Sequence, residues 1–218
     1  MPQTTRSSCK RNGATHLGEL LNNDALATIK LSEPYVVSVT TQGVSTMLCH
    51  RWSDESVEAK AKAAKGSTAK RTDDIDSYVY RNNKNEICIP GSYLYGTIAD
   101  KKGGAAKYRQ DPRSPRKSAL DLYRAGVVVL TELASLGIKD WDHLDRRRVV
   151  VNNSGITRVR PAILAGWEAT FEVMVQLPEY ITPTDLLDVI AQGGKLCGFG
   201  DFRPTYGRFC VTRFDLLG

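Results

Sequence analysis

The sequence predicts an α+β domain, and the C-terminal third carries most of that prediction. Residues 168–177 alternate strictly between apolar and polar side chains, which is typical of a strand with one buried face. Thr182 then caps a helix with Pro at its first position, and Gly193-Gly194 is expected to end that helix. A final strand is expected over residues 208–216, so this third predicts strand, helix, loop and strand.

The N-terminal half predicts a related order of elements. Residues 28–41 are rich in β-branched side chains, which favour a strand, and a Gln-Gly turn is expected to lead into a returning strand over residues 44–52. A short apolar strand over residues 87–89 leads into a Pro-Gly-Ser corner and a helix that begins near Pro90. Together the two halves predict the βαββαβ core of a ferredoxin-like, or RRM-like, fold.

Three further segments are expected to decorate this core, within one domain that spans residues 1–218. Residues 53–86 combine helix-forming Ala, Glu and Lys with an acidic cluster and lack an apolar face, which indicates a large exposed insertion with several lysines. Residues 100–117 form a basic loop broken by glycine and proline. Residues 118–136 carry apolar side chains at helical spacing, and this helix is either the first helix of the core or an extra one.

A β-hairpin is expected over residues 146–152 and 157–163, which are separated by Asn153-Ser154-Gly155. Alternate residues of a strand share a face. The four arginines expected to form one basic stripe in this way are Arg146, Arg148, Arg158 and Arg160. The alternative for each is a salt bridge with a nearby aspartate.

Composition and charge narrow the classes of function. The 218 residues include 41% hydrophobic residues, no long apolar run and no N-terminal apolar segment, so we expect a cytoplasmic protein with neither a signal peptide nor a membrane span. The five cysteines lie far apart without a CxxC pair, so no disulfide framework, metal site or cofactor is expected. Residues 101–160 carry 14 Lys and Arg against 6 Asp and Glu. A local excess of this kind indicates a phosphate-backbone partner.

Residues 198–209 combine glycines, aromatic side chains and two arginines. Glycine permits a close approach of the backbone to a ligand, aromatic rings stack on bases, and arginine binds phosphate. The segment therefore predicts a polyanion-binding loop, with nucleic acid as the first candidate. The alternative is a structural turn with its aromatic side chains in the core and its arginines in water.

Two segments resemble the RAMP superfamily. Ile89-Pro90-Gly91-Ser92-Tyr93-Leu94-Tyr95-Gly96 resembles its I-P-G-S-S-L-K-G helix start, and Gly198-x-Gly200-x6-Gly207 resembles its C-terminal glycine-rich loop. These ferredoxin-fold proteins bind CRISPR RNA, and they include the backbone subunits that polymerise along a guide RNA. Tyr93 and Tyr95 depart from the family, which has small and basic residues there.

The resemblance implies a set of RNA contacts. Gly91 and Ser92 would present backbone N–H groups to a phosphate, as helix N-termini do, and Gly198, Gly200 and Gly207 would shape a loop that contacts the RNA backbone. The other side chains expected at the interface, besides the four arginines of the stripe, are Tyr93, Tyr95, Lys101, Lys102, Phe202, Arg203 and Arg208.

We therefore expect an RNA-binding subunit without catalytic activity that contacts the phosphate backbone largely independently of sequence. It would pack beside copies of itself and other subunits of a ribonucleoprotein. The first alternative is an RNA-processing endonuclease that uses His50 as general acid or base. The others are a single-stranded-DNA-binding protein of a phage or plasmid and a structural assembly protein without nucleic acid. The sequence has no P-loop, dinucleotide or metalloprotease motif.

Overall fold

The computed structural model describes residues 33–51, 62, 74–151 and 154–217. The start of the first expected strand, at residues 28–32, lies outside the described residues, as does most of the insertion expected over residues 53–86. The fold is a mixed α+β architecture with antiparallel sheets, as the sequence predicts.

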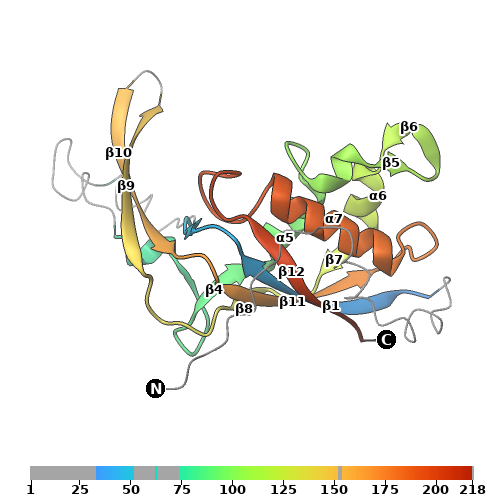
Figure 1. Ribbon diagram of the computed structural model, residues 1–218, viewed down its shortest axis with the longest axis horizontal. Helices are drawn as coiled ribbons and strands as arrows, with labels where there is room; N and C mark the ends of the chain where they lie inside the picture. Colours follow the sequence, from blue (N-terminus) through green and yellow to red (C-terminus); the bar gives the residue numbers. More distant parts are fainter. Residues whose placement is uncertain (1–32, 52–61, 63–73, 152–153, 218) are drawn as a thin grey trace.

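A four-stranded antiparallel sheet forms the centre of the molecule (Figure 1). Its order is β12 (Phe209–Leu216), β1 (Tyr35–Gly43), β11 (Glu168–Val175) and β7 (Val127–Val129). The alternation predicted for β11 is confirmed, because every second side chain from Ala169 onward is buried. β1 alternates in the same way, and its buried Val37 and Val39 lie opposite Val173 and Phe171 of β11 on the same face of the sheet.

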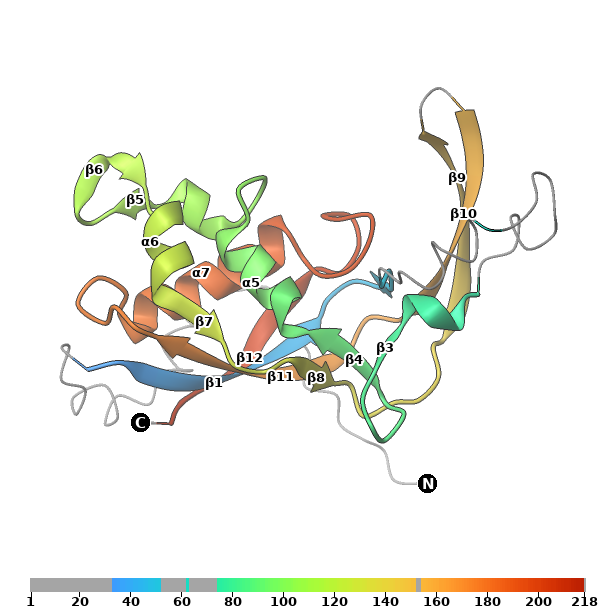
Figure 2. The same ribbon diagram turned by 180° about the vertical axis from the view of Figure 1, so that it is seen from behind.

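Three helices lie on one face of this sheet: α5 (Gly91–Ala99), α6 (Leu120–Gly126) and α7 (Pro183–Leu196) (Figures 1 and 2). The predicted helix starts are confirmed at Gly91 and at Pro183. Thr182 and Asp185 form a capping box at the start of α7, in which each side chain bonds to the other residue's backbone N–H.

The expected end of α7 at Gly193-Gly194 is wrong, since the helix continues to Leu196. Both glycines serve packing instead. A Cβ at Gly193 would lie 2.8 Å from the carbonyl oxygen of Thr97, and one at Gly194 would lie 2.3 Å from that of Phe209. Glycine therefore lets α7 approach α5 and β12 closely.

The helix expected over residues 118–136 is also wrong. Only α6 is helical, and the chain then forms β7 and β8 (Leu133–Ser135). Val127, Val128 and Val129 are β-branched and pair with β11, so tertiary pairing overrides their helical spacing.

The returning strand expected over residues 44–52 is replaced by a short strand in another sheet. The Gln42-Gly43 turn is wrong too, because both residues belong to β1. β2 (Met47–Leu48) pairs with β10 (Ser154–Ile163), which pairs in turn with β9 (His143–Val151). The predicted hairpin at β9 and β10 is confirmed, and it begins earlier than expected.

Shorter elements complete the described chain. β3 (Tyr80–Arg81), β4 (Ile87–Pro90) and β8 form a three-stranded sheet, while β5 (Gln110–Asp111) pairs with β6 (Ser114–Ser118). The short 3-10 helices η1 (Asp76–Tyr78) and η2 (Ala105–Tyr108) precede β3 and β5. The β9–β10 hairpin projects from one end of the molecule, and the β5–β6 hairpin lies at the other (Figures 1 and 2). Among the described helices, none combines the length and the apolar character needed to span a membrane.

Candidate nucleic-acid interface

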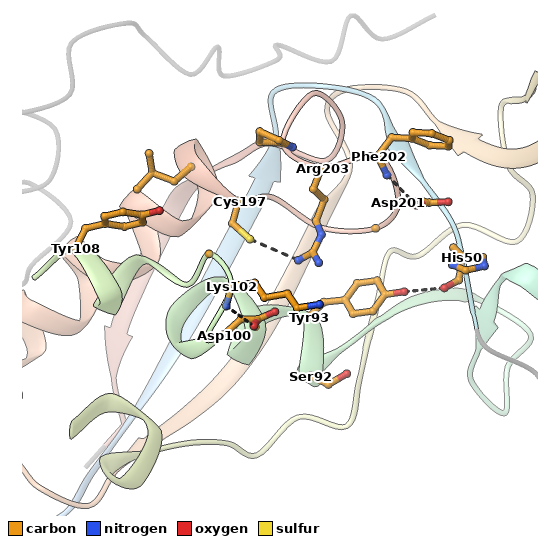
Figure 3. Close-up of a pocket in the computed structure, with 15 residues that line it drawn as sticks. His50, Ser92, Tyr93, Asp100, Lys102, Tyr108, Cys197, Asp201, Phe202 and Arg203 are labelled. Atoms are coloured by element: carbon orange, nitrogen blue, oxygen red, sulfur yellow. Dashed lines mark hydrogen bonds between the residues drawn. The ribbon is translucent and has the colours of Figure 1, made fainter. Parts of the chain in front are cut away.

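The two segments that resemble the RAMP superfamily meet at one groove of about 870 Å³ (Figure 3). We call it the loop–helix groove. One wall comes from α5 and the chain that follows it, and the other from the last residue of α7 and the loop after it, together called the loop of residues 196–204. The lining residues are His50, Ser92, Tyr93, Gly96, Asp100, Lys102, Gly103, Tyr108, Leu196, Cys197, Gly200, Asp201, Phe202, Arg203 and Pro204.

The start of α5 is held tightly against the neighbouring strands. The N–H of Gly91 donates a hydrogen bond of 2.9 Å to the carbonyl oxygen of Glu132, so it is not offered to a phosphate as the resemblance implies. A Cβ at this residue would lie 2.0 Å from the carbonyl oxygen of Thr131, so glycine serves packing here. Ser92 is exposed in the first helical turn, where N–H groups lack intrahelical acceptors.

The two tyrosines of α5 face different sides of the helix. Tyr93 lines the loop–helix groove, and its hydroxyl donates to the carbonyl oxygen of His50 at 3.0 Å. Burial raises the pKa of the Tyr93 phenol, so the hydroxyl stays protonated. Tyr95 does not line this groove, and its hydroxyl donates to the carbonyl oxygen of Arg124.

The glycines of the loop are conformational and steric necessities. Gly198, Gly200 and Gly207 all have φ between +74° and +78°, a region that favours glycine. A Cβ at Gly200 would lie 2.3 Å from the carbonyl oxygen of Leu48, and one at Gly207 would lie 1.8 Å from that of Phe199. These glycines therefore let the loop pack against the protein's own backbone.

The aromatic side chains of the loop divide between core and surface. Phe199 is fully buried and stacks on Phe209 with ring centroids 4.3 Å apart, which anchors the loop in the core. Phe202 lines the groove and has φ of 54°, an outlier for a bulky residue. Its N–H donates to the Asp201 carboxylate, and the Arg147 guanidinium lies 4.7 Å from its ring centroid.

Both signs of charge line the groove. Arg203 extends from the loop toward α5 (Figure 3). Its guanidinium donates to the thiol of Cys197, which directly follows α7, at 3.5 Å. Lys102 is exposed, and its backbone N–H donates to the Asp100 carboxylate. Lys101 is exposed but does not line the groove, and the Arg208 side chain bonds to the Pro204 carbonyl oxygen within the loop.

Asp201 ties the groove to the β9–β10 hairpin. Its carboxylate accepts a hydrogen bond of 2.9 Å from Arg160, which is buried with its guanidinium 4.4 Å from the Tyr78 ring centroid. Burial alone raises the pKa of Asp201, but the bonds from Arg160 and the Phe202 N–H outweigh it and hold the pKa below its usual range. The Arg160 guanidinium therefore contacts Asp201 and Tyr78 within the protein and is not exposed at the surface.

The register of the hairpin separates the four arginines expected in one stripe. Arg147 pairs with Arg158, so Arg146 and Arg148 lie on the opposite face from Arg158 and Arg160. The sequence misleads here because the strand pairing, and not alternation alone, decides which residues of two strands share a face. Arg146 and Arg148 are exposed.

Arg147 connects the hairpin to the glycine-rich loop. Its guanidinium donates to both carboxylate oxygens of Asp145 and to the Tyr206 hydroxyl, at 2.5–2.7 Å. It also lies 4.5 Å from the Tyr206 ring centroid and 4.7 Å from that of Phe202. The bond to Asp145 raises the pKa of Arg147 and lowers that of Asp145. This cluster fixes one end of the groove.

Several lining residues were not expected, among them Tyr108 and Gly96. Tyr108 is 65% exposed, which leaves its ring free as a stacking platform. Gly96 lies in the middle of α5, and a Cβ there would meet no atom within 4 Å. The only sequence signal for Tyr108 is an aromatic residue inside a basic loop. Gly96 is part of the segment that resembles the RAMP superfamily.

The face of the main sheet opposite the described helices is a poor alternative site. An RRM sheet stacks bases on aromatic side chains. Here the corresponding face carries Ser38, Thr40, Thr170 and Glu172. Over the described chain, no three His, Cys, Asp or Glu side chains are grouped as metal ligands.

Comparisons with known proteins show a distant structural likeness. No protein-family model and no curated protein matches the sequence. Among solved structures, the chain is similar to one in the crystal structure of the Csm3-Csm4 subcomplex in the type III-A CRISPR-Cas interference complex. The identity is 14% and the TM-score 0.33, over 86% of this chain and 77% of that chain. A TM-score of this size does not establish a common fold or function.

Proposed function

We propose that the protein binds single-stranded RNA in the loop–helix groove, mainly through its phosphate backbone, as a subunit of a ribonucleoprotein. The observation that carries the proposal is the convergence of α5 and the loop of residues 196–204 on one groove. Ser92, Lys102 and Arg203 offer hydrogen bonds or positive charge there, and Tyr108 offers an exposed ring.

A ferredoxin-like assignment is part of this proposal. The sheet order β12-β1-β11-β7 is antiparallel throughout, α5 lies between β1 and β7 in the chain, and α7 lies between β11 and β12. This connectivity supports a βαββαβ core with additional segments inserted before α5, before β7 and between β7 and β11.

The shape of the groove favours a single strand over a duplex. It is bounded by the loop of residues 196–204 and by η2, and its exposed ring requires an unstacked base. Its charge is mixed, because Asp100 and Asp201 also line it. The exposed arginines of the β9–β10 hairpin, Arg146 and Arg148, would supply additional phosphate contacts at the projecting end.

Fluorescence anisotropy with a labelled single-stranded RNA, repeated over a salt series, tests the proposal. The wild-type protein should bind several unrelated sequences with similar affinity. Lys102→Ala combined with Arg203→Ala should lower the log–log salt slope by about 0.7 for each phosphate that the variant no longer binds. Lys195→Ala is the matched control, because Lys195 is exposed on α7 and does not line the groove. Binding of the double variant that matches wild type at every salt concentration would contradict the proposal.

Assembly beside further copies is the second part of the proposal. The projecting β9–β10 hairpin is long enough to contact a neighbour, and Val150 at its outer part is 71% exposed. Light scattering with RNA of increasing length should show a mass that rises in steps of one protein. A constant single copy per RNA would contradict side-by-side assembly without affecting the binding claim.

RNA cleavage is the second candidate, because His50 lines the groove. His50 also lies close enough to the Asp201 carboxyl group for its charge to help lower the pKa of that group. Incubation of labelled RNA with wild type and with His50→Ala decides between the two. We expect no difference between them, whereas one clean cut that is absent in His50→Ala would favour the nuclease. Fluorescence anisotropy with labelled single-stranded DNA in place of RNA tests the DNA-binding alternative.

A further inference from the structure

A second pocket, of about 780 Å³, lies on the other side of the start of α5. We call it the β7 pocket. Ser92 lines both this pocket and the loop–helix groove, so the two adjoin at the first turn of α5. Tyr80 and Tyr93 pack edge to face with centroids 6.1 Å apart, and Tyr80 lines the β7 pocket while Tyr93 lines the groove. A strand that crosses Ser92 would therefore pass from one into the other.

The chemistry of the β7 pocket combines cations with flat and apolar surfaces. Arg51 is exposed, with its guanidinium 5.7 Å from the Tyr80 ring centroid. The Arg124 side chain is 39% exposed. Val128 and Leu130 are 37% and 44% exposed and give the pocket an apolar surface. Glu132 is the one carboxylate among the described residues that line the pocket, so the lining has a positive excess.

The edge of β7 offers little for a peptide strand to pair with. The N–H of Val127, at the start of β7, already donates to the carbonyl oxygen of Tyr123. The carbonyl oxygen of Glu132 already accepts from Gly91. Strand addition depends on a row of free backbone groups, and here that row is interrupted. The charge and the interrupted edge together favour an anionic ligand with a flat apolar part.

We propose that the β7 pocket binds one nucleotide unit of the single strand that the loop–helix groove carries. The base lies against the apolar surface of Val128 and Leu130, and the phosphate is bound by Arg51 and Arg124. This inference depends on the proposed function for its ligand, and it adds a separate subsite to it. The pocket extends the RNA contact from the loop side of α5 to the edge of the main sheet.

Opposite charges introduced at one residue test the pocket. Val128→Glu should weaken binding of single-stranded RNA at least fivefold, because it places a carboxylate beside the phosphate. Val128→Lys should bind as tightly as wild type or more tightly. Glu and Lys disturb the strand similarly, so an equal loss of affinity in both variants would show an apolar or structural role and overturn the proposal. Arg124→Ala should also weaken binding, whereas Arg116→Ala, an exposed control outside the pocket, should not.

Cross-linking locates the bound nucleotide. RNA that carries one 4-thiouridine should cross-link to Tyr80 or Tyr95 in wild type and not in Arg124→Ala. RNA that binds but cross-links only to residues of the loop–helix groove would overturn the β7 pocket and leave the proposed function intact. If RNA does not bind wild type at all, the proposed function fails. The β7 pocket is then tested by titration with adenosine 5′-monophosphate, followed by NMR. If the signals of Tyr80 and Tyr95 do not shift, the pocket proposal is overturned.

Discussion

The glycines around the groove fall into two groups that differ in what a side chain would meet. At Gly96 and Gly103 a Cβ would meet no atom within 4 Å. At Gly200 and Gly207 it would meet the protein's own backbone at 2.3 Å or less, and both have positive φ. The fold requires glycine in the second group. It does not require glycine at residue 96, because alanine would fit there and would favour the helix.

Alanine substitutions should therefore change stability in opposite directions. Gly96→Ala should raise the free energy of unfolding by about 0.5–1 kcal/mol, the usual preference for alanine over glycine within a helix. Gly200→Ala should lower it by more than about 1 kcal/mol, because its φ of +78° is strained for alanine and its Cβ meets the carbonyl oxygen of Leu48. Urea denaturation measures both. A Gly200→Ala variant as stable as wild type would contradict the packing role of this glycine.

Strain at Phe202 gives a second test at this scale. Its φ of 54° suits glycine better than any side chain. Phe202→Ala and Phe202→Gly both remove the ring beside Arg147, so their difference isolates the backbone contribution. Phe202→Gly should be more stable than Phe202→Ala by about 1 kcal/mol in thermal or urea unfolding. Equal stabilities would mean that the loop relaxes out of this conformation.

Single residues were predictable where the chemistry is local. The loop of residues 198–209 and the start of α5 were both identified from glycines, aromatic side chains and a Pro-Gly-Ser corner. The reason for each glycine was not predictable, because the sequence does not distinguish open space from the protein's own backbone. Gly91 and Gly200 therefore lie near the candidate site and serve packing.

At the scale of elements, the β9–β10 hairpin has one face that is attached to the loop and one face that is free among the described residues. Arg147 attaches it to the loop through Asp145 and Tyr206. Arg146 and Arg148 lie on the other face, where they are exposed. The two faces therefore predict different consequences of removing an arginine.

Removing Arg146 and Arg148 together should affect binding and leave folding intact. We expect an unchanged melting temperature and a log–log salt slope for RNA that falls by about 0.7 for each phosphate left unbound. Arg147→Ala should instead lower the melting temperature, because it leaves Asp145 without its ion pair. Calorimetry and anisotropy on the same preparations measure both. A double variant with an unchanged slope would exclude the free face as a contact surface.

The Asp145–Arg147 pair also predicts a dependence of stability on pH. The hydrogen bonds that Asp145 accepts from Arg147 lower the pKa of Asp145 below the value of about 3.9 for an unfolded chain. The pair therefore stabilises the fold fully above about pH 4 and loses its effect as pH falls through the lower folded-state pKa. The difference in unfolding free energy between wild type and Asp145→Asn, measured from about pH 7 to acid, should be constant above about pH 5 and shrink below about pH 4. A difference that already shrinks near neutral pH would contradict the assignment.

Elements were predictable where pattern and pairing agree. The alternation of β11 and the capping box of α7 are local signals, and both are confirmed. The helix expected over residues 118–136 failed, because β7 gains a partner strand that the sequence does not display. The arginine stripe failed for the same reason, since the register between β9 and β10 depends on the turn between them.

At the scale of the whole molecule, the central observation is that two segments far apart in the sequence form one groove. α5 follows β4, and the loop follows α7, and both helices lie on the same face of the main sheet (Figure 2). A βαββαβ interpretation of the sequence places both helices on one side of a sheet, so the sequence could predict that the two segments lie close together. The β7 pocket was not, because it depends on the strand that replaced the expected helix.

The central claim is that RNA occupies the loop–helix groove, and Gly96→Leu tests it most directly. The new side chain would project into the groove from a helical position with open space, so the fold should be retained or stabilised. Ala125→Leu is the matched control, because it adds a similar side chain at an exposed helical position outside the groove. Anisotropy with single-stranded RNA should show at least a tenfold loss of affinity for Gly96→Leu, about 1.4 kcal/mol, and no loss for Ala125→Leu. A folded Gly96→Leu that binds RNA as tightly as wild type would contradict the account.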